Sequence, residues 1–238
     1  MDFNKNWKSN IECKVIPIGG GLLRLGETIA IDKFIVKESS RKNPKVLFIP
    51  TASKDLPAYS SAFQRVYKKL GCQVKILRLF NKIKFSQTTL EKLITSADII
   101  YVGGGDYDIL LSMWKKHKII PLIQSAYRRG TILAGLSAGC AVWYEYLIDS
   151  DENKKTRLKK GLGMLKGIVI PHYKAENPFP LEIRKTKTIV TAIEDKCAVI
   201  YINEHLKGSI PVTREKAFTI RPPYAKKKQV TLYFHKSR

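Results

Sequence analysis

Long hydrophobic runs, paired cysteines and acidic residues are all scarce in this chain of 238 residues. No uninterrupted apolar stretch approaches the ~18 residues that a membrane-spanning helix needs. The opening segment, MDFNKNWKSN, lacks the apolar stretch of a secretory signal. The four cysteines are widely separated and form no CxxC pair, which argues against a disulfide framework or a zinc site. We therefore expect a soluble, cytoplasmic protein that has no membrane partner and binds no metal.

Acidic side chains are outnumbered, with 20 Asp and Glu against 43 Lys and Arg and a formal net charge of +23. Such an excess is typical of nucleic-acid-binding proteins, because cationic side chains release the counterions of phosphates. Here the Lys and Arg residues are spread along the chain apart from a small cluster at 225–228, and they are not concentrated in a nucleic-acid-binding motif. We interpret the charge as a solvated surface that can attract anionic substrates, and we expect no nucleic-acid partner.

Apolar runs alternate with amphipathic stretches in the first two thirds of the chain. Runs rich in Val, Ile and Leu predict buried strands that start at Cys13 and Asp98, and others at 45–50, 74–80 and 131–136. Apolar residues at helical spacing predict helices in the segments 58–71, 88–97, 107–118 and 121–130. Strand–helix–strand alternation over residues 13–147 predicts a largely parallel sheet with helices on both faces.

The pattern changes after residue 160, where strand-like runs have shorter connections. These runs are GIVIPHY (167–173), CAVIYIN (197–203), KAFTIRP (216–222) and VTLYFH (230–235). We expect antiparallel additions at one edge of the sheet, and a surface loop in the polar segment 149–163. The predicted fold is a single α/β domain over 1–238, with an N-terminal extension (1–11) and a core (12–238). Its central sheet is mostly parallel, with helices on both faces and extra antiparallel strands in the C-terminal third.

The segment TILAGLSAGCAVW (131–143) carries the most information about chemistry. Its GLSAG, Gly135 to Gly139, fits G-x-S-x-G between an apolar strand and a helix-like stretch, the context in which this motif holds a nucleophile. Ser137 at the apex is expected to adopt a strained backbone that aims its hydroxyl into a cleft. The Ala138 N–H, at the start of the following helix, is then a natural donor to an oxyanion. The alternative is a turn of small residues that serves packing alone.

A second glycine-rich turn, Gly103-Gly104-Gly105-Asp106, follows the predicted strand that starts at Asp98. Glycines let the backbone approach a ligand and present amides to it, so Gly104 or Gly105 is expected to supply the second oxyanion N–H. A phosphate-binding loop is the weaker interpretation, because the spacing matches neither GxGxxG nor GxxxxGK. The earlier glycines of IGGGLLRLGE (18–27) are interpreted as structural, with the rim of an active site as the alternative.

A serine hydroxyl needs a base to become a nucleophile, and the chain has four histidines. His117, His205 and His235 lie in charged or terminal segments and are expected to be exposed. His172 ends the apolar run GIVIP, where the end of a strand meets a cleft. Elimination therefore favours His172 as the base.

Two groups of carboxylates are candidates to orient the histidine ring and stabilise its charged form. The first lies between the predicted nucleophile and base, in the polar segment: Asp149, Asp151 and Glu152. The second follows His172 in TAIEDKCAVIY, at a predicted turn, and consists of Glu194 and Asp195. We favour the second group because rigid strands flank it. The residues alone leave open which of the two faces the site.

Together these segments resemble the dipeptidase E / cyanophycinase family of serine peptidases, whose fold is similar to that of class I glutamine amidotransferases. The resemblance covers residues 13–205 and rests on IPIGGG, KNPKVLFIPTAS, YVGGGD, AGLSAGC, IPHY and AIEDKCAV. It implies Ser137 as nucleophile, His172 as base, and Gly105 and Ala138 as the oxyanion amides. It favours Asp195 as the acid, with Glu194 one step away.

The resemblance implies a serine-type exopeptidase without a cofactor that hydrolyses an amide bond in short peptides through an acyl-enzyme on Ser137. N-terminal Asp-X dipeptides are among the substrates it implies. The family often has Asn where this chain has Asp106, a difference that bears on how a substrate is held. Arg184 is a candidate contact for an acidic side chain, although its RKTK segment is more typical of plain surface.

Three alternatives remain at this point. The first is a serine hydrolase that acts on another acyl substrate. The second is an amidotransferase-like enzyme with Cys140 as nucleophile, and the third is a non-catalytic binding protein on the same scaffold. For the peptidase, a small peptide is the expected partner, and a homodimer through the added strands stays open.

Overall fold

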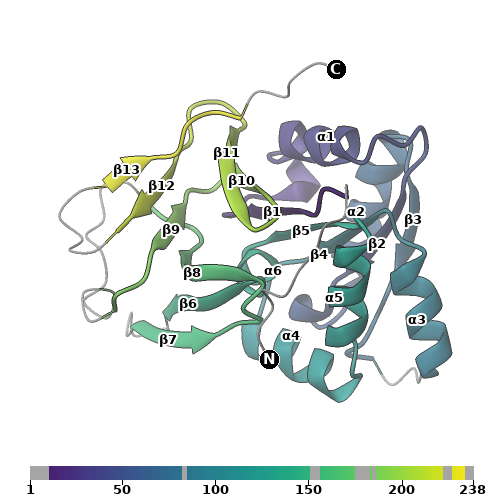
Figure 1. Ribbon diagram of the computed structural model, residues 1–238. Coiled ribbons are helices and arrows are strands. Elements are labelled where there is room, and N and C mark those ends of the chain that lie inside the picture. The colour runs from purple at the N-terminus through teal and green to yellow at the C-terminus, as the bar shows by residue number, and fades with distance from the viewer. Residues whose placement is uncertain are drawn as a thin grey trace.

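Two β-sheets form the framework, and the helices gather around the larger one (Figure 1). The computed structural model describes residues 11–81, 85–150, 156–174, 183, 186–221 and 227–233. The larger sheet has seven strands in the order β11-β10-β1-β5-β4-β2-β3, and the smaller has six in the order β13-β12-β9-β8-β6-β7. Among the described residues, no helix has the length and apolar character to cross a bilayer. Several residues singled out above lie outside the described ranges: residues 1–10, Asp151, Glu152, Arg184 and His235.

The centre of the larger sheet is parallel and consists of the predicted apolar runs. Its parallel strands are β1 (Lys14–Ile18), β2 (Lys45–Ile49), β3 (Gln73–Ile76), β4 (Ile99–Val102) and β5 (Ile132–Leu136). Beside β1, the strands β10 (Cys197–Ile202) and β11 (His205–Pro211) add antiparallel pairs. A mostly parallel central sheet with antiparallel strands from the C-terminal third is thus confirmed.

Helices cover both faces of this sheet, because successive strand residues point to opposite sides. The helices are α1 (Ile29–Glu38), α2 (Pro57–Lys69), α3 (Gln87–Thr95), α4 (Tyr107–Lys116) and α5 (Ile120–Arg128). Phe48 and Tyr101 pack on one face in a cluster with residues of α1 and α2. Leu47 and Ile100 pack on the other face in a cluster with residues of α3, α4 and α5. The layered α/β fold follows directly from this alternation.

The other strands after α6 form a second sheet rather than only extending the first. Its strands are β6 (Tyr144–Ser150), β7 (Thr156–Lys160), β8 (Leu165–Ile170), β9 (Val190–Ile193), β12 (Ala217–Ile220) and β13 (Lys227–Gln229). The pairs β6–β8 and β8–β9 are parallel, and the other pairs are antiparallel. The predicted strand at 230–235 is wrong within its described part, where Leu232 makes only an isolated bridge to Ser209.

The predicted surface loop at 149–163 is wrong at 149–150 and 156–160, which belong to strands, while 151–155 lie outside the described residues. Strands β6 and β7 pair antiparallel there, with Asp149 opposite Arg157 in the register. β7 lies at the edge of its sheet, and much of it is exposed. An edge strand needs few apolar residues, so its charged sequence gave no sign of a strand.

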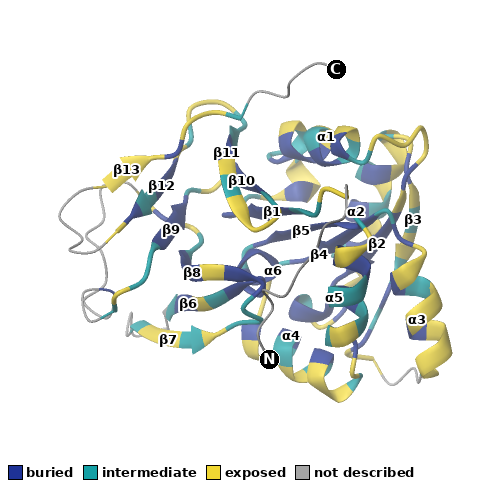
Figure 2. Ribbon diagram, in the orientation of Figure 1, coloured by how far each residue is buried: buried dark blue, intermediate teal, exposed yellow. Residues whose placement is uncertain are grey.

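One apolar core joins the two sheets where their strands meet, and Figure 2 shows β5, a strand within this core, as buried. Val15 and Leu133 of the larger sheet belong to the same cluster as Leu165 and Val169 of the smaller sheet. The chain crosses from one sheet to the other through β5, the one-turn helix α6 (Ala138–Ala141) and β6. This crossing contains the GLSAG motif.

Candidate active site

Ser137 lies where β5 ends and α6 begins. Its φ of +57° is uncommon for a residue other than glycine and indicates a sharp, strained turn. Small neighbours are required because backbone crowds the turn: a Cβ on Gly135 would overlap the carbonyl of Gly139, and one on Gly139 would overlap that of Val102. The predicted helix after Ser137 is a single turn, since Tyr144 already begins β6. Only its first amides, rather than a long helix dipole, can act on a nearby charge.

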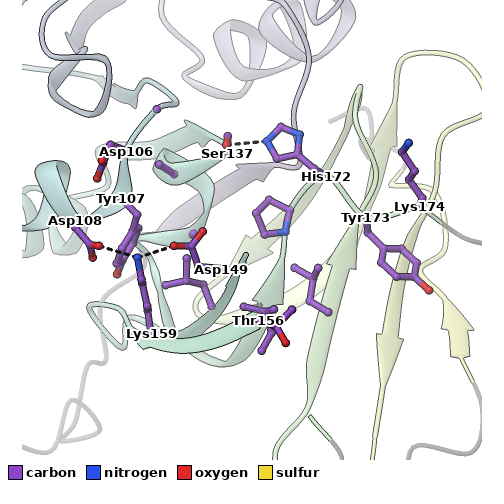
Figure 3. A pocket seen from close by; sticks show the side chains of 17 residues that line it. Asp106, Tyr107, Asp108, Ser137, Asp149, Thr156, Lys159, His172, Tyr173 and Lys174 are labelled. Carbon is purple, nitrogen blue, oxygen red and sulfur yellow. Dashed lines mark hydrogen bonds and ion pairs between the residues drawn. The ribbon is translucent and has the colours of Figure 1, made fainter. Parts of the chain in front are cut away.

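His172 approaches Ser137 from the smaller sheet. It follows β8 after Pro171, and its own φ is +53°. Its backbone N–H donates to the carbonyl of Gly19 at 3.2 Å, which anchors it to the end of β1. Its Nε2 lies 2.8 Å from Ser137 Oγ (Figure 3). The two side chains are therefore within hydrogen-bond distance.

Asp195 extends this contact to a chain of three residues. Its Oδ1 lies 2.6 Å from His172 Nδ1, in the turn between β9 and β10. Glu194 points elsewhere and accepts the Lys216 N–H at 2.7 Å. The hydrogen bond to His172 is the main cause that lowers the pKa of Asp195 from its ordinary value. The carboxylate is thus ionised at neutral pH and accepts from Nδ1–H, which leaves Nε2 to accept the proton of Ser137.

Gly20 lies directly behind the His172–Asp195 pair. A Cβ on Gly20 would overlap Asp195 Oδ1 and would lie 2.5 Å from His172 Cε1. The carbonyl of Gly20 also accepts the Lys196 N–H at 3.0 Å. The first glycine run therefore belongs to the site, which matches the alternative of an active-site rim rather than the preferred structural interpretation. The available signal was its place at the end of a parallel strand, the edge at which such sheets bind ligands.

The second glycine turn lies on the other side of Ser137. A Cβ on Gly104 would lie 3.2 Å from Ser137 Cβ, so this backbone passes close to the serine. Gly105 has a φ of +139°, and a Cβ there would overlap the carbonyl of Ala52. Gly105 and Ala138 line the same cavity as Ser137. Ala138 is the first residue of α6, a position whose N–H has no acceptor within its own helix.

A cavity of about 600 Å³ opens in front of Ser137 and His172. The start of α4, the β6–β7 hairpin and the segment after β8 form its walls (Figure 3). Lys159 Nζ lies 2.7 Å from Asp108 and 2.6 Å from Asp149, so this lysine links β7 to α4 and β6. Asp149 thus pairs with Lys159 and not with His172.

Asp106 and Lys174 also line this cavity. Asp106 caps α4, because its Oδ1 accepts the Ile109 N–H at 2.9 Å. Lys174 comes shortly after His172, and its positive charge contributes to the lowered pKa of Asp195. The cavity therefore has carboxylates on the α4 side and a cation beyond the histidine.

The other candidate groups lie in different surroundings. His117 Nε2 is 3.0 Å from the carbonyl oxygen of Leu79, and His205 Nδ1 is 2.6 Å from that of Asn203. Cys140 is fully buried, and burial raises the pKa of its thiol, which disfavours a thiolate nucleophile. Among the residues that the structure describes, no three His, Cys, Asp or Glu side chains are grouped to hold a metal ion.

The fold and these side chains define a class of protein: an α/β protein in which serine, histidine and aspartate form one hydrogen-bonded chain, the arrangement typical of serine hydrolases. Residues 15–208 match the model of peptidase family S51, and the chain belongs to this family. The resemblance drawn from the sequence motifs is confirmed.

Two curated relatives support the family. The uncharacterized peptidase YgaJ of Bacillus subtilis (strain 168) is 32% identical over 193 residues, which cover 79% of this chain and 82% of the relative. Peptidase E of Shewanella denitrificans is 31% identical over 120 residues, which cover 49% of this chain and 48% of the relative.

Two solved structures share the fold. A peptidase from an acI-B1 actinobacterium has a TM-score of 0.73 at 20% identity, over 94% of this chain and 96% of that one. A putative peptidase E protein from Listeria monocytogenes EGD-e has a TM-score of 0.63 at 19% identity, over 85% of this chain and 100% of that one.

Proposed function

We propose that this protein is a serine peptidase in which Ser137 is the nucleophile, His172 the general base and Asp195 the acid that orients the histidine. The observation that carries the proposal is the hydrogen-bonded chain from Ser137 Oγ to His172 Nε2 at 2.8 Å and from His172 Nδ1 to Asp195 Oδ1 at 2.6 Å. The first contact has the length at which a proton can pass between the serine and the ring, and the second holds the ring in the orientation that this transfer needs.

The reaction begins when Ser137 Oγ attacks the carbonyl carbon of the amide and its proton moves to His172 Nε2. The N–H groups of Gly105 and Ala138 stabilise the tetrahedral oxyanion. His172 then protonates the leaving amine, the C–N bond breaks, and the acyl group remains as an ester on Ser137. Water gives a proton to His172 and attacks this ester, and the C–O bond to Ser137 then breaks as His172 returns the proton to Ser137 Oγ, which releases the acid and restores the serine. Asp195 stays ionised and stabilises the charged ring.

The proposed substrates are short peptides cleaved by an exopeptidase, with N-terminal Asp-X dipeptides among them. Membership in family S51 and the similarity to a relative named peptidase E support this proposal. The cavity of about 600 Å³ has the size of sites that enclose small ligands. The net charge of +23 favours the approach of an anionic peptide such as Asp-X.

A panel of Asp-X, Glu-X and Ala-X dipeptides, each with a free and an acetylated amino terminus, tests the proposal. We expect Ser137→Ala to lower kcat by at least ~10³-fold on every cleaved peptide, because the members of a triad act as a unit. Ser112→Ala is the matched control: its hydroxyl donates to the Ile109 carbonyl on α4, and its rate should be unchanged. Equal rates for Ser137→Ala and wild type would overturn the nucleophile, and equal cleavage of acetylated peptides would overturn the exopeptidase.

The geometry favours neither of the two alternatives in which Ser137 is not the nucleophile. A non-catalytic binding protein would tolerate a His172 out of reach of Ser137, whereas the two are 2.8 Å apart. An amidotransferase-like enzyme would need an accessible thiolate, whereas Cys140 is buried. A fluorophosphonate probe separates these cases, because it labels an activated serine and leaves a binding protein unmodified.

A further inference from the structure

The turn Gly103–Asp106 presents four successive backbone N–H groups next to Ser137. Three of them have acceptors: Gly103 N–H donates to the carbonyl of Ile49 (3.0 Å), Gly104 N–H to Tyr59 Oη (3.4 Å) and Asp106 N–H to the carbonyl of Ala52 (2.8 Å). Gly105 is the exception, and within the described part of the chain nothing accepts its N–H. The amide proposed to bind the oxyanion is thus the one that its neighbours leave unused.

Tyr59 differs from the other two acceptors because it is a side chain. It lies in the first turn of α2 (Pro57–Lys69), and its ring packs edge-on against Phe48, with 5.1 Å between centroids. The ring also fills the space beside Gly103, where a Cβ would lie 2.9 Å from Tyr59 Cε1. Burial raises the pKa of Tyr59 to about 12, so the phenol stays neutral and its oxygen can accept from the Gly104 amide.

Three glycines in a row have little stiffness of their own, because each can rotate through a wide range of φ and ψ. The direction of the Gly105 N–H depends on the rotation about the Gly104 backbone, which directly precedes it. Fixing the Gly104 N–H removes part of this freedom before a substrate arrives. An oxyanion site of this kind works because its donors are already oriented.

We propose that Tyr59 is a positioning residue for the oxyanion site: its phenol oxygen holds the Gly104 amide, so that the neighbouring Gly105 N–H points at the carbonyl oxygen attacked by Ser137. This inference rests on the proposed peptidase function. It assigns Tyr59 no contact with the substrate.

Tyr59→Phe tests it, because this change keeps the ring and removes only the oxygen. With the dipeptide Asp-Leu as probe, we expect kcat to fall ~10-fold, less than the 10²–10³-fold that loss of a donor itself costs. KM should change less than twofold, since the ground-state contacts remain. Binding of an aspartyl aldehyde, which forms a tetrahedral adduct with the serine, should weaken by the same ~10-fold factor, because it needs the same donors.

Tyr67→Phe is the matched control. Tyr67 lies two turns further along α2, and its phenol donates to Asp32 Oδ1 at 2.9 Å instead of to the glycine turn. We expect this variant to melt at a lower temperature with an unchanged kcat. A similar fall of kcat in both variants, measured where both are folded, would show a merely structural effect and overturn the proposal.

Amide exchange of the wild-type protein gives a second test that needs no variant. By NMR, the Gly104 amide should exchange at least ~10-fold more slowly than that of Gly105, because only the former is hydrogen-bonded. Equal exchange, or unchanged kcat and aldehyde binding in Tyr59→Phe, would overturn the role of Tyr59. Ser137→Ala separates the two hypotheses: if it is inactive while Tyr59→Phe behaves as wild type, only the present inference fails.

Discussion

Gly20→Ala adds a single methyl group to the wall behind the His172–Asp195 pair. The φ of Gly20 lies outside the left-handed region, so alanine can adopt this backbone without strain. The added Cβ would overlap Asp195 Oδ1 and would lie 2.5 Å from His172 Cε1. Carbon atoms pack at ~3.5–4.0 Å, so the ring or the carboxylate must move by about 1 Å.

A movement of this size is large compared with the contacts it affects. The hydrogen bond between His172 Nδ1 and Asp195 Oδ1 is 2.6 Å long, and one that lengthens by about 1 Å is lost. Misplacement of a catalytic group by about 1 Å costs ~10²-fold in rate, and loss of the aspartate from a triad costs ~10⁴-fold. We therefore expect kcat to fall by ~10²–10⁴-fold, or roughly 3–5 kcal/mol in the barrier. KM should change little, because no substrate contact is removed.

The assay is steady-state cleavage of Asp-Leu, combined with thermal unfolding of each variant. Gly26→Ala is the control, because nothing lies within 4 Å of its added Cβ while its φ of +76° strains the alanine. It should lose about 1 kcal/mol of stability and keep wild-type kcat. Gly20→Ala should instead keep the stability of the wild type and lose kcat. In a Ser137→Ala background, Gly20→Ala should have no further effect on the rate.

A kcat of Gly20→Ala within threefold of wild type would refute the reasoning, since the methyl group would then fit without disturbing the pair. A loss of rate that only follows the fraction of unfolded protein would refute it as well. That result would mean that Gly20 serves the fold rather than the site.

Three further predictions concern the roles of individual side chains. Asp195→Asn should lower kcat ~10⁴-fold while Glu194→Gln stays within twofold, because Glu194 bonds a backbone amide instead of the histidine. Burial raises the pKa of Asp32 to about 6, so the folded state binds this proton more tightly than the unfolded chain does and stability falls as pH rises. Urea unfolding should show a loss of about 2 kcal/mol between pH 4 and 7 that Asp32→Asn lacks. Mass spectrometry should find fluorophosphonate on Ser137 in the native protein and iodoacetamide on Cys140 only after unfolding, since the thiol is buried.

Each of these has a contrary outcome. A rate loss in Glu194→Gln equal to that in Asp195→Asn would mean that the turn as a whole, and not the carboxylate at the histidine, is required. Parallel pH profiles of the wild type and Asp32→Asn would assign the pH dependence to other groups. Native labelling of Cys140 would revive the amidotransferase-like alternative.

Fully buried strands are the elements that the sequence predicts best. β4 and β5 are buried at every position because helices cover both faces of their sheet, so each is a continuous apolar run between glycines or polar residues. The β6–β7 hairpin could not be predicted in the same way, because it lies at an edge and β7 is largely exposed. The helix-like stretch after Ser137 forms only a one-turn helix, because Trp143 and Tyr144 are buried where the chain turns into the second sheet.

The residues of the candidate site also differ in how well the sequence predicts them. Ser137 and His172 could be singled out locally, because each has a distinctive residue type at the end of an apolar strand. The choice between Glu194 and Asp195 depends on which way two adjacent side chains point from a turn, which residue type and spacing do not encode. The glycine run that contains Gly20 was singled out only as an alternative, the rim of an active site. The contact of Gly20 with Asp195, like that of Tyr59 with Gly104, joins segments far apart in the chain, and no local pattern marks such a contact.

The end of β1 explains how residues from the two sheets are held at fixed distances from one another. Three successive carbonyls there each accept one N–H: Ile18 from Ser137 (3.0 Å), Gly19 from His172 (3.2 Å) and Gly20 from Lys196 (3.0 Å), the residue that follows Asp195. Ser137, His172 and Lys196 all have positive φ, which costs of order 1 kcal/mol or more at each residue and persists only where the surroundings hold it. The backbone leaving β1 supplies that restraint, and it can approach His172 and the turn at Glu194 and Asp195 only because Gly19 and Gly20 have no Cβ to collide with them. The first glycine run is therefore the common reference that sets the distances between serine, histidine and aspartate.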